Sequence, residues 1–309
     1  MLKAYSVISD LNKDACEMIK TAGVQLDISN SNERPDKKKL TELFYKYDIL
    51  IIGTKEKLTK DMLSGINSKK IIATLSVGLD HIDEQFFNTD LVKIINCPTS
   101  NVMSVAEHIF GLILGLNKRI IEANDISING GSRNQLSMRP HDISNTTIGI
   151  IGAGKISREV IKIAKAFNMK ILCNTLNPEM CKDLLEQGII FLSLDEVLAN
   201  SDIITVNIPL NEENTNLISK DKIHLMKKTA TFINTARDKI VDMQALLEYA
   251  DENSTFKVGL DIDTEDYKEL LNKKRNNVIV TPHIAGNTVE AVKRMDIELA
   301  KNIKEYLIR

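Results

Sequence analysis

The chain has 309 residues, with 40 Lys and Arg against 42 Asp and Glu, and a formal net charge of −2. A chain of this length predicts about two domains, and its near-neutral charge gives no electrostatic reason to expect nucleic acid or a membrane surface as partner. Its apolar runs fall far short of the roughly 20 residues that span a bilayer. With no signal-peptide pattern and four cysteines that lack CxxC spacing, we expect a cytoplasmic protein with reduced thiols.

Short β-branched runs alternate with helical patterns along the whole chain. This alternation predicts doubly wound parallel sheets, in which helices cover both faces and strands need not alternate polar and apolar residues. We expect strands at 4–8, 49–52, 71–75, 92–96, 148–151, 170–172, 203–207, 231–234, 257–261 and 278–280. Between the two sets of strands, a long helix is expected from Ser104 to about Ile121, with Ser104 and Glu107 at capping-box spacing. The polar segment 128–145 is expected to form a loop or an arm.

A glycine-rich turn follows the strand expected at 148–151. It reads Gly152-Ala153-Gly154-Lys155-Ile156-Ser157, which is the dinucleotide fingerprint G-x-G-x-x-G with serine at its last position. In that fingerprint the first glycine makes the tight turn, and the second lets the backbone approach a pyrophosphate at the helix N-terminus. The pattern favours a dinucleotide site over a glycine-rich turn that binds nothing.

The strand after this helix does not end in the acid that usually holds the ribose hydroxyls. Thr175 is the best positional match, and Lys182 is the nearest cation. An acid at this place repels a 2′-phosphate, so its absence removes the usual barrier to NADP without supplying a clamp for the phosphate. The choice between NAD and NADP stays open.

Polar side chains follow three of the later strands. Arg237 stands after 231–234, Asp261 ends the strand at 257–261 with more acids beyond it, and His283 stands after 278–280. Because parallel strands end at one edge of a sheet, these groups converge where a nicotinamide would lie. Arginine can grip a carboxylate, and histidine can exchange a proton near neutral pH. With a hydride from nicotinamide, such a set interconverts a 2-hydroxy acid and a 2-oxo acid.

The motifs resemble the D-isomer specific 2-hydroxyacid dehydrogenases, a family that includes phosphoglycerate dehydrogenases and glyoxylate/hydroxypyruvate reductases. The segments that carry the resemblance are 76–83, 101–108, 149–154, 234–237, 259–262 and 281–286. The resemblance implies a Rossmann nucleotide domain at 101–285, inserted in a flavodoxin-like substrate domain formed by 1–100 and 286–309. It also implies NAD or NADP as cofactor, with NAD the commoner choice in the family, and a homodimer built on the helix from Ser104 and the arm after it.

The resemblance also assigns roles to individual residues. Arg237 would bind the substrate carboxylate together with the backbone N–H groups of Val77 and Gly78, and His283 would be the acid/base. The cofactor would be bound by Gly152, Gly154, Lys155, Ile156, Thr175, Pro209, Thr215, Ala236, Asp261 and Gly286. No cluster of side chains has metal-ligand spacing, so we expect no metal.

Two positions near the expected site depart from the family pattern. The catalytic glutamate of the family, which precedes a proline, corresponds to Asp266 before Tyr267, and Glu265 is one residue earlier; either acid could partner His283. Asp238 stands where the family often has glycine. A relative that only senses the dinucleotide, like a corepressor, and a phosphite-type dehydrogenase remain the alternative functions. The presence of both Arg237 and His283 favours the enzyme over the corepressor.

Overall fold

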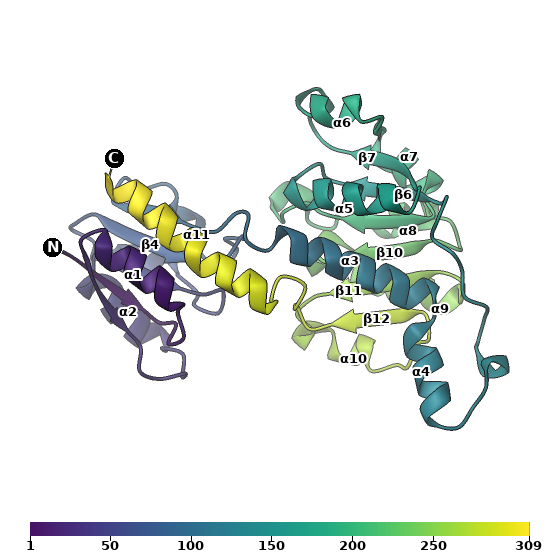
Figure 1. Ribbon diagram of the computed structural model, residues 1–309, viewed down its shortest axis with the longest axis horizontal. Coiled ribbons are helices and arrows are strands. Elements are labelled where there is room, and N and C mark those ends of the chain that lie inside the picture. Colours follow the sequence, from purple (N-terminus) through teal and green to yellow (C-terminus); the bar gives the residue numbers. More distant parts are fainter. Residues whose placement is uncertain (309) are drawn as a thin grey trace. The chain divides into compact units, whose positions relative to one another are not determined.

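A computed structural model describes residues 1–308, and the chain divides into two compact units. Met1–Asn101 and Thr288–Arg309 form the first, and Val102–Asn287 forms the second (Figure 1). The divisions expected from the resemblance lie at 100/101 and 285/286, within two residues of these bounds. The first unit is therefore discontinuous, because the last helix returns to the sheet built by the N-terminal residues.

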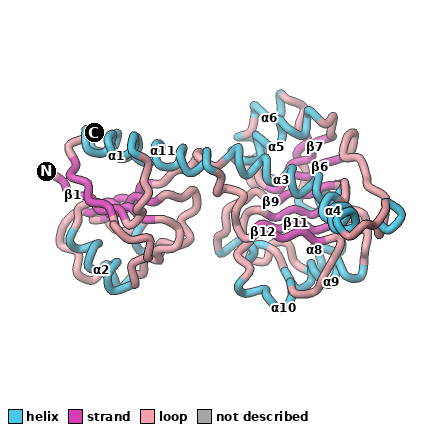
Figure 2. The backbone as a smooth tube through the Cα atoms, turned by 60° about the horizontal axis from the view of Figure 1, so that its bottom comes forward, coloured by secondary structure: helices cyan, strands magenta, loops and turns pink. Residues whose placement is uncertain are grey.

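The first unit holds one five-stranded parallel sheet with strand order β2-β1-β3-β4-β5. Its strands are β1 (Leu2–Ser6), β2 (Val24–Ile28), β3 (Ile49–Ile52), β4 (Lys70–Thr74) and β5 (Val92–Ile95). Its helices are α1 (Lys13–Thr21), α2 (Lys37–Lys46) and α11 (Val289–Ile308). Helices α1 and α11 pack side by side on one face, where Ile19 and Ile303 share a core, and α2 covers the other face through Leu40 and Phe44 (Figure 2).

The second unit holds a seven-stranded parallel sheet with strand order β12-β11-β10-β9-β6-β7-β8. Its strands are β6 (Thr147–Ile151), β7 (Lys170–Asn174), β8 (Ile190–Phe191), β9 (Ile203–Val206), β10 (Thr231–Asn234), β11 (Lys257–Asp261) and β12 (Val278–Thr281). Its helices are α3 (Val102–Asn117), α4 (Ile120–Ile128), α5 (Lys155–Ala166), α6 (Lys182–Glu186), α7 (Leu194–Asn200), α8 (Lys220–Leu225), α9 (Met243–Glu252) and α10 (Lys268–Leu271).

Helices cover both faces of this second sheet. Side chains of α3 and α5 share one apolar core with β6, and α8 and α9 share another with β9 to β11 (Figure 1). The chain runs outward from β6 through β7 and β8, then returns to β9 on the other side of β6. The strand order therefore reverses between β6 and β9, and in such sheets ligands bind outside the carboxyl ends of the strands at this reversal.

The predicted fold class, two doubly wound parallel sheets, is confirmed. Two edge strands, β2 and the two-residue β8, were not predicted. The long helix expected from Ser104 to Ile121 is wrong in both bounds: α3 ends at Asn117, and the left-handed Arg119 (φ 57°) separates it from α4. The capping box is also wrong, because α3 begins at Val102 and Ser104 is a buried residue of its first turn. None of the helices among residues 1–308 is long and apolar enough to cross a membrane.

Candidate active site

The glycine-rich turn lies where the strand order reverses. Gly152 follows β6 with φ 98°, and a Cβ on it would lie 2.6 Å from the carbonyl oxygen of Asn207, the residue after β9. Only glycine tolerates both the positive φ and this close approach. Gly154 is the N-cap of α5; a Cβ there would meet open space, and this end of the helix has no side-chain capping bond within the described chain. Lys155 and Ile156 are the first two residues of α5, and the N-terminus of a helix is a favourable position for an anion.

Ser157 explains why the turn forms without the third fingerprint glycine. Its side chain is fully buried, and its hydroxyl donates to the carbonyl oxygen of Gly152 at 2.7 Å. A buried donor at the same edge has no acceptor, since Nδ2 of Asn207 donates to no atom of residues 1–308. A tight turn, a helix N-terminus without a capping side chain and a buried donor without an acceptor fit a bound dinucleotide, whose phosphate and ribose oxygens accept hydrogen bonds.

At the end of β7 the structure places Thr175 half-buried, beside Asn174, whose amide donates to the carbonyl of Leu192 at 3.1 Å. Arg158 on α5 contacts the carbonyl of Ala153 in the glycine-rich turn, and its Nη2 lies 2.9 Å from Oδ1 of Asp183. Asp183 therefore balances the charge of this arginine.

Arg237 stands on a turn that Asn234 shapes. Asn234 is fully buried at the end of β10; its Oδ1 accepts the N–H of Ala236 at 3.0 Å, and its Nδ2 donates to the carbonyl of Arg237 at 2.8 Å. The half-buried Arg237 donates from Nη1 to the carbonyl of Ala236 at 2.8 Å. Pro209 and Thr215, both exposed, flank the short 3-10 helix Glu212–Asn214 beyond β9.

Asp261, at the end of β11, is fully buried and holds the loop after β12. Its Oδ1 accepts the Thr281 hydroxyl at 2.6 Å and the N–H of Ile284 at 2.9 Å, and its Oδ2 accepts the N–H of Ala285 at 2.7 Å. On α3, Nε2 of His108 lies 2.9 Å from the Thr281 hydroxyl, so α3 joins the same network. The bonds of Asp261 therefore shape the loop that carries His283 and continues to Gly286.

His283 lies in the left-handed region with φ 53°, and its N–H donates to the carbonyl of Thr281 at 3.0 Å. Nδ1 of its imidazole lies 3.8 Å from Oδ2 of Asp263, a carboxylate with 91% of its side chain exposed. Glu265 and Asp266 lie in the 3-10 helix Glu265–Tyr267, and within residues 1–308 neither forms an ion pair with this imidazole. Asp263 was not predicted as the neighbour of His283, because the family pattern aligns its catalytic glutamate with Asp266.

In the first unit, Val77 and Gly78 follow β4 in a loop held by side chains. The Ser76 hydroxyl donates to the carbonyl of Gly78 at 2.7 Å, and Nδ2 of Asn96 donates to the carbonyl of Val77 at 2.9 Å. The carbonyls are thus engaged, whereas the N–H groups of Val77 and Gly78 donate to nothing in the described chain. Two adjacent open N–H groups suit an anion. No group of three or more potential metal ligands occurs among residues 1–308.

Comparison with known proteins identifies the family to which the chain belongs. Residues 110–285 match the family described as D-isomer specific 2-hydroxyacid dehydrogenase, NAD binding domain. A hydroxypyruvate reductase of Thermotoga maritima is 30% identical over 301 residues, which cover 96% of each chain. The chain belongs to the D-isomer specific 2-hydroxyacid dehydrogenase family. It is therefore an NAD(P)-dependent oxidoreductase of 2-hydroxy and 2-oxo acids.

Two solved structures and a further relative define the similarity in more detail. An acyclic imino acid reductase in complex with NADPH and D-Arg has a TM-score of 0.88 at 28% identity, covering 99% of this chain and 97% of that one. A D-lactate dehydrogenase of Aquifex aeolicus with NAD and lactic acid has a TM-score of 0.81 at 30% identity, covering 99% and 95%. A D-3-phosphoglycerate dehydrogenase of Archaeoglobus fulgidus is 29% identical, but this chain spans only 56% of its length.

Proposed function

We propose that this dehydrogenase reduces a short 2-oxo acid such as hydroxypyruvate or glyoxylate, with Arg237 binding the carboxylate and His283 acting as acid/base. The observation that carries the proposal is the pair of buried side chains, Asn234 and Asp261, that shape the Arg237 turn and the His283 loop. The two loops follow β10 and β12, which flank β11, on the edge where Gly152 follows β6. The similarity to hydroxypyruvate reductase over nearly the full length of both chains supports a short substrate.

The nicotinamide of the bound cofactor supplies the hydride for the 2-oxo carbon. The Gly152–Gly154 turn and the first N–H groups of α5 would hold the pyrophosphate. Arg237 would grip the substrate carboxylate through two parallel N–H···O bonds. A protonated His283 would then give its proton to the substrate oxygen as negative charge develops there.

The carboxylate that supports His283 is the next part of the proposal. The sequence register favours Asp266 or Glu265, whereas Oδ2 of Asp263 lies 3.8 Å from Nδ1 of the imidazole. A carboxylate beside Nδ1 can fix the orientation and the tautomer of the ring. We expect Asp263→Asn to lower kcat and to leave the Kd for NADH unchanged. Glu265→Gln and Asp266→Asn serve as the comparison, and a loss of kcat in one of them alone would move the role to that acid.

The reaction is tested by following NADH or NADPH oxidation with glyoxylate, hydroxypyruvate, pyruvate and 3-phosphohydroxypyruvate. We expect turnover with glyoxylate and hydroxypyruvate. The kcat of His283→Ala should be lower by at least about 100-fold, which is the low end of the contribution of a general acid. His224→Ala, at an exposed histidine in α8, is the matched control and should keep full activity. Full turnover by His283→Ala would refute its role, and activity confined to the phosphorylated substrate would refute the substrate class.

We propose that the protein is a homodimer whose interface includes α4. This helix buries none of its residues within the chain, and Ile120, Ile121 and Ile128 are 54%, 53% and 72% exposed. Exposed isoleucines on a helix that buries none of its residues favour a second copy of the chain as their partner. Sedimentation equilibrium should give twice the chain mass, and Ile121→Asp with Ile128→Asp should give monomers. Unchanged assembly of this double variant would exclude α4 from the interface.

We also propose a reducing, cytoplasmic setting. Among residues 1–308 all four cysteines are free thiols, and Cys97, Cys173 and Cys181 are buried. Burial raises the pKa of Cys173 to about 12, which keeps its thiol protonated and unreactive. Free buried thiols are typical of proteins kept in reducing compartments. Recovery of the protein in the cytoplasmic fraction of its cells would agree with this, and recovery from an oxidising compartment would not.

A further inference from the structure

Two residues that depart from the family pattern contact each other. The hydroxyl of Tyr267 donates to Oδ2 of Asp238 at 2.7 Å, although 29 residues separate them in sequence. Asp238 lies directly after Arg237 at the end of β10, and Tyr267 closes the 3-10 helix that follows β11. Because β10 and β11 are neighbours in the sheet, the bond joins the turn that carries Arg237 to the loop at 263–267, which follows β11.

The placement of Asp238 creates a chemical problem that this bond addresses. A carboxylate one residue from Arg237 attracts the guanidinium and competes with the substrate carboxylate that the guanidinium binds. A phenol that donates to the carboxylate disperses its charge and fixes its rotamer. Burial, the hydrogen bond and the charge of Asp238 all raise the pKa of Tyr267, so the phenol stays a donor throughout the neutral range.

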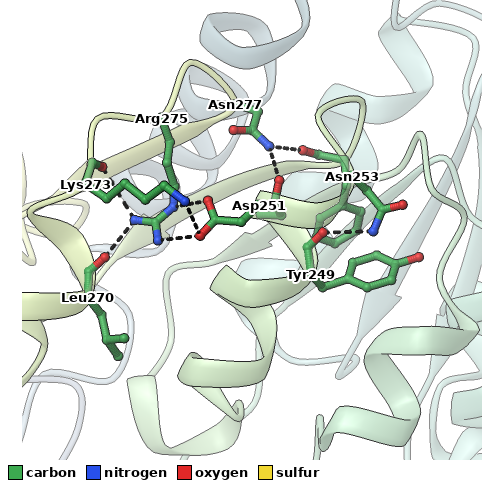
Figure 3. Close-up of polar contacts among 9 residues, drawn as sticks. Tyr249, Asp251, Asn253, Leu270, Lys273, Arg275 and Asn277 are labelled. Atoms are coloured by element: carbon green, nitrogen blue, oxygen red, sulfur yellow. Dashed lines mark hydrogen bonds and ion pairs between the residues drawn. The ribbon is translucent and has the colours of Figure 1, made fainter.

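The loop that carries Tyr267 is anchored independently at its far end. Nε and Nη2 of Arg275 donate to the two carboxylate oxygens of Asp251 at 2.7 and 3.0 Å, and Nη1 donates to the carbonyl of Leu270 at 2.7 Å (Figure 3). Nδ2 of Asn277 adds bonds to the carbonyls of Ala250 and Phe256. The ring of Tyr267 packs against the apolar core under the sheet. Loss of the phenol oxygen should therefore release Asp238 without releasing the loop.

We propose that Tyr267 is a positioning residue for substrate binding: its hydroxyl holds the Asp238 carboxylate and weakens the competition of this carboxylate with the 2-oxo acid for the Arg237 guanidinium. The inference rests on the proposed role of Arg237. The Tyr267 hydroxyl thus offsets the electrostatic cost of the Asp238 carboxylate. Neither residue takes part in proton or hydride transfer.

The test is a double-mutant cycle in the full-length protein. Tyr267→Phe should raise KM for the preferred 2-oxo acid about 1.5- to fivefold, the range for one partly exposed charge pair, with kcat within about twofold. Asp238→Asn keeps an acceptor for the phenol and removes the charge, so KM should stay the same or fall. Adding Asp238→Asn to Tyr267→Phe should restore KM. Tyr249→Phe is the matched control, because it removes a buried tyrosine hydroxyl that donates to the Met226 carbonyl on another element.

Each outcome separates this inference from the proposed function. If Arg237→Lys raises KM but Tyr267→Phe does not, the role of Tyr267 is refuted while that of Arg237 stands. If the double variant keeps the high KM of Tyr267→Phe, the effect does not pass through the Asp238 charge and the inference is refuted. If Arg237→Lys leaves KM unchanged, the proposed role of Arg237 fails first. The Kd for NADH, measured without substrate, should be equal in the parent and in the Tyr267 and Asp238 variants. The Tyr267–Asp238 hydrogen bond is expected to affect only the binding of the substrate carboxylate.

Discussion

The Asp261 carboxylate binds the loop of His283 on both sides of the histidine. It accepts the Thr281 hydroxyl at 2.6 Å before His283, and the N–H groups of Ile284 and Ala285 after it. His283 itself holds φ 53°, a conformation that a non-glycine residue keeps only when its surroundings impose it. The geometry of the histidine is thus set by a buried carboxylate on the neighbouring strand. Although the resemblance gives Asp261 a contact with the cofactor, each of its oxygens already accepts at least one internal bond.

Asp261→Asn should lower both stability and activity. One backbone N–H loses its acceptor when an amide nitrogen replaces an oxygen, and bonds to a charged acceptor contribute about 1.5–3 kcal/mol each. We expect the free energy of unfolding to fall by about 2–3 kcal/mol and kcat to fall at least tenfold as His283 moves. Chemical denaturation and steady-state kinetics measure the two effects. A stable variant with normal kcat would show that the loop keeps its shape without Asp261.

The two fingerprint glycines should respond differently to alanine. Gly152→Ala places a Cβ 2.6 Å from a backbone oxygen at φ 98°, so we expect at least about 1 kcal/mol of destabilisation. Gly154→Ala places its Cβ in open space at φ −74°, so the melting temperature should stay the same. The Kd for NADH should nevertheless rise several-fold if a pyrophosphate approaches Gly154. Unchanged affinity in Gly154→Ala would mean that the phosphates bind elsewhere.

Structure that depends on local order along the chain could be predicted from the sequence. The strand, the glycine turn and the apolar helix at 147–166 form one continuous segment, so the fingerprint could be recognised directly. Arg237 and His283 could be assigned to one edge of the sheet because parallel strands bring their carboxyl ends together, and their roles in catalysis stay predictions. The helix break at Arg119 was missed because nothing in the apolar pattern of α3 and α4 marks it. Its left-handed backbone is accompanied by an ion pair of its buried guanidinium with Glu122.

Contacts between loops could not be predicted from the sequence. The Tyr267–Asp238 bond and the Asp263–His283 ion pair each depend on the lengths and turns of two separate loops, which periodicity does not determine. For the same reason the network from His108 through Thr281 to Asp261 was missed. The position of His108 on α3 does not indicate that its partner is Thr281 on β12.

The Arg275–Asp251 pair should stabilise the second unit in a pH-dependent way. The Arg275 guanidinium holds the pKa of Asp251 below its usual range, so the stabilisation is present above about pH 4, where an unfolded aspartate is ionised, and is lost as pH falls through the lowered pKa. Arg275→Ala should cost about 1–2 kcal/mol at pH 7, since Arg275 is 8% exposed and bidentate. The gap in melting temperature between parent and variant should close toward pH 3. Lys37→Ala, which breaks an exposed pair with Asp61, should have little effect at any pH.

Asp296 in α11 is a buried carboxylate whose ionisation opposes folding. It is 4% exposed, and burial together with the charge of Asp10 raises its pKa, although its Oδ2 accepts the N–H of Asn12 at 2.9 Å. A raised folded-state pKa means that the stabilising contribution is complete below the unfolded pKa, near 4, and is lost as pH rises through the folded value. Asp296→Asn keeps an acceptor for Asn12 and carries no charge.

We therefore expect Asp296→Asn to be more stable than the parent at pH 7. A gain of about 1 kcal/mol would raise the melting temperature by ~2–4 °C in a protein of this size. The two proteins should converge toward pH 3, where Asp296 is protonated in the parent. Asp10→Asn, which removes only the neighbouring charge, should shift the melting temperature in the same direction by less. A variant that is less stable than the parent at pH 7 would show instead that the ionised Asp296 supports the packing of α1 against α11, because the carboxylate would then be the stronger acceptor for the N–H at the start of α1.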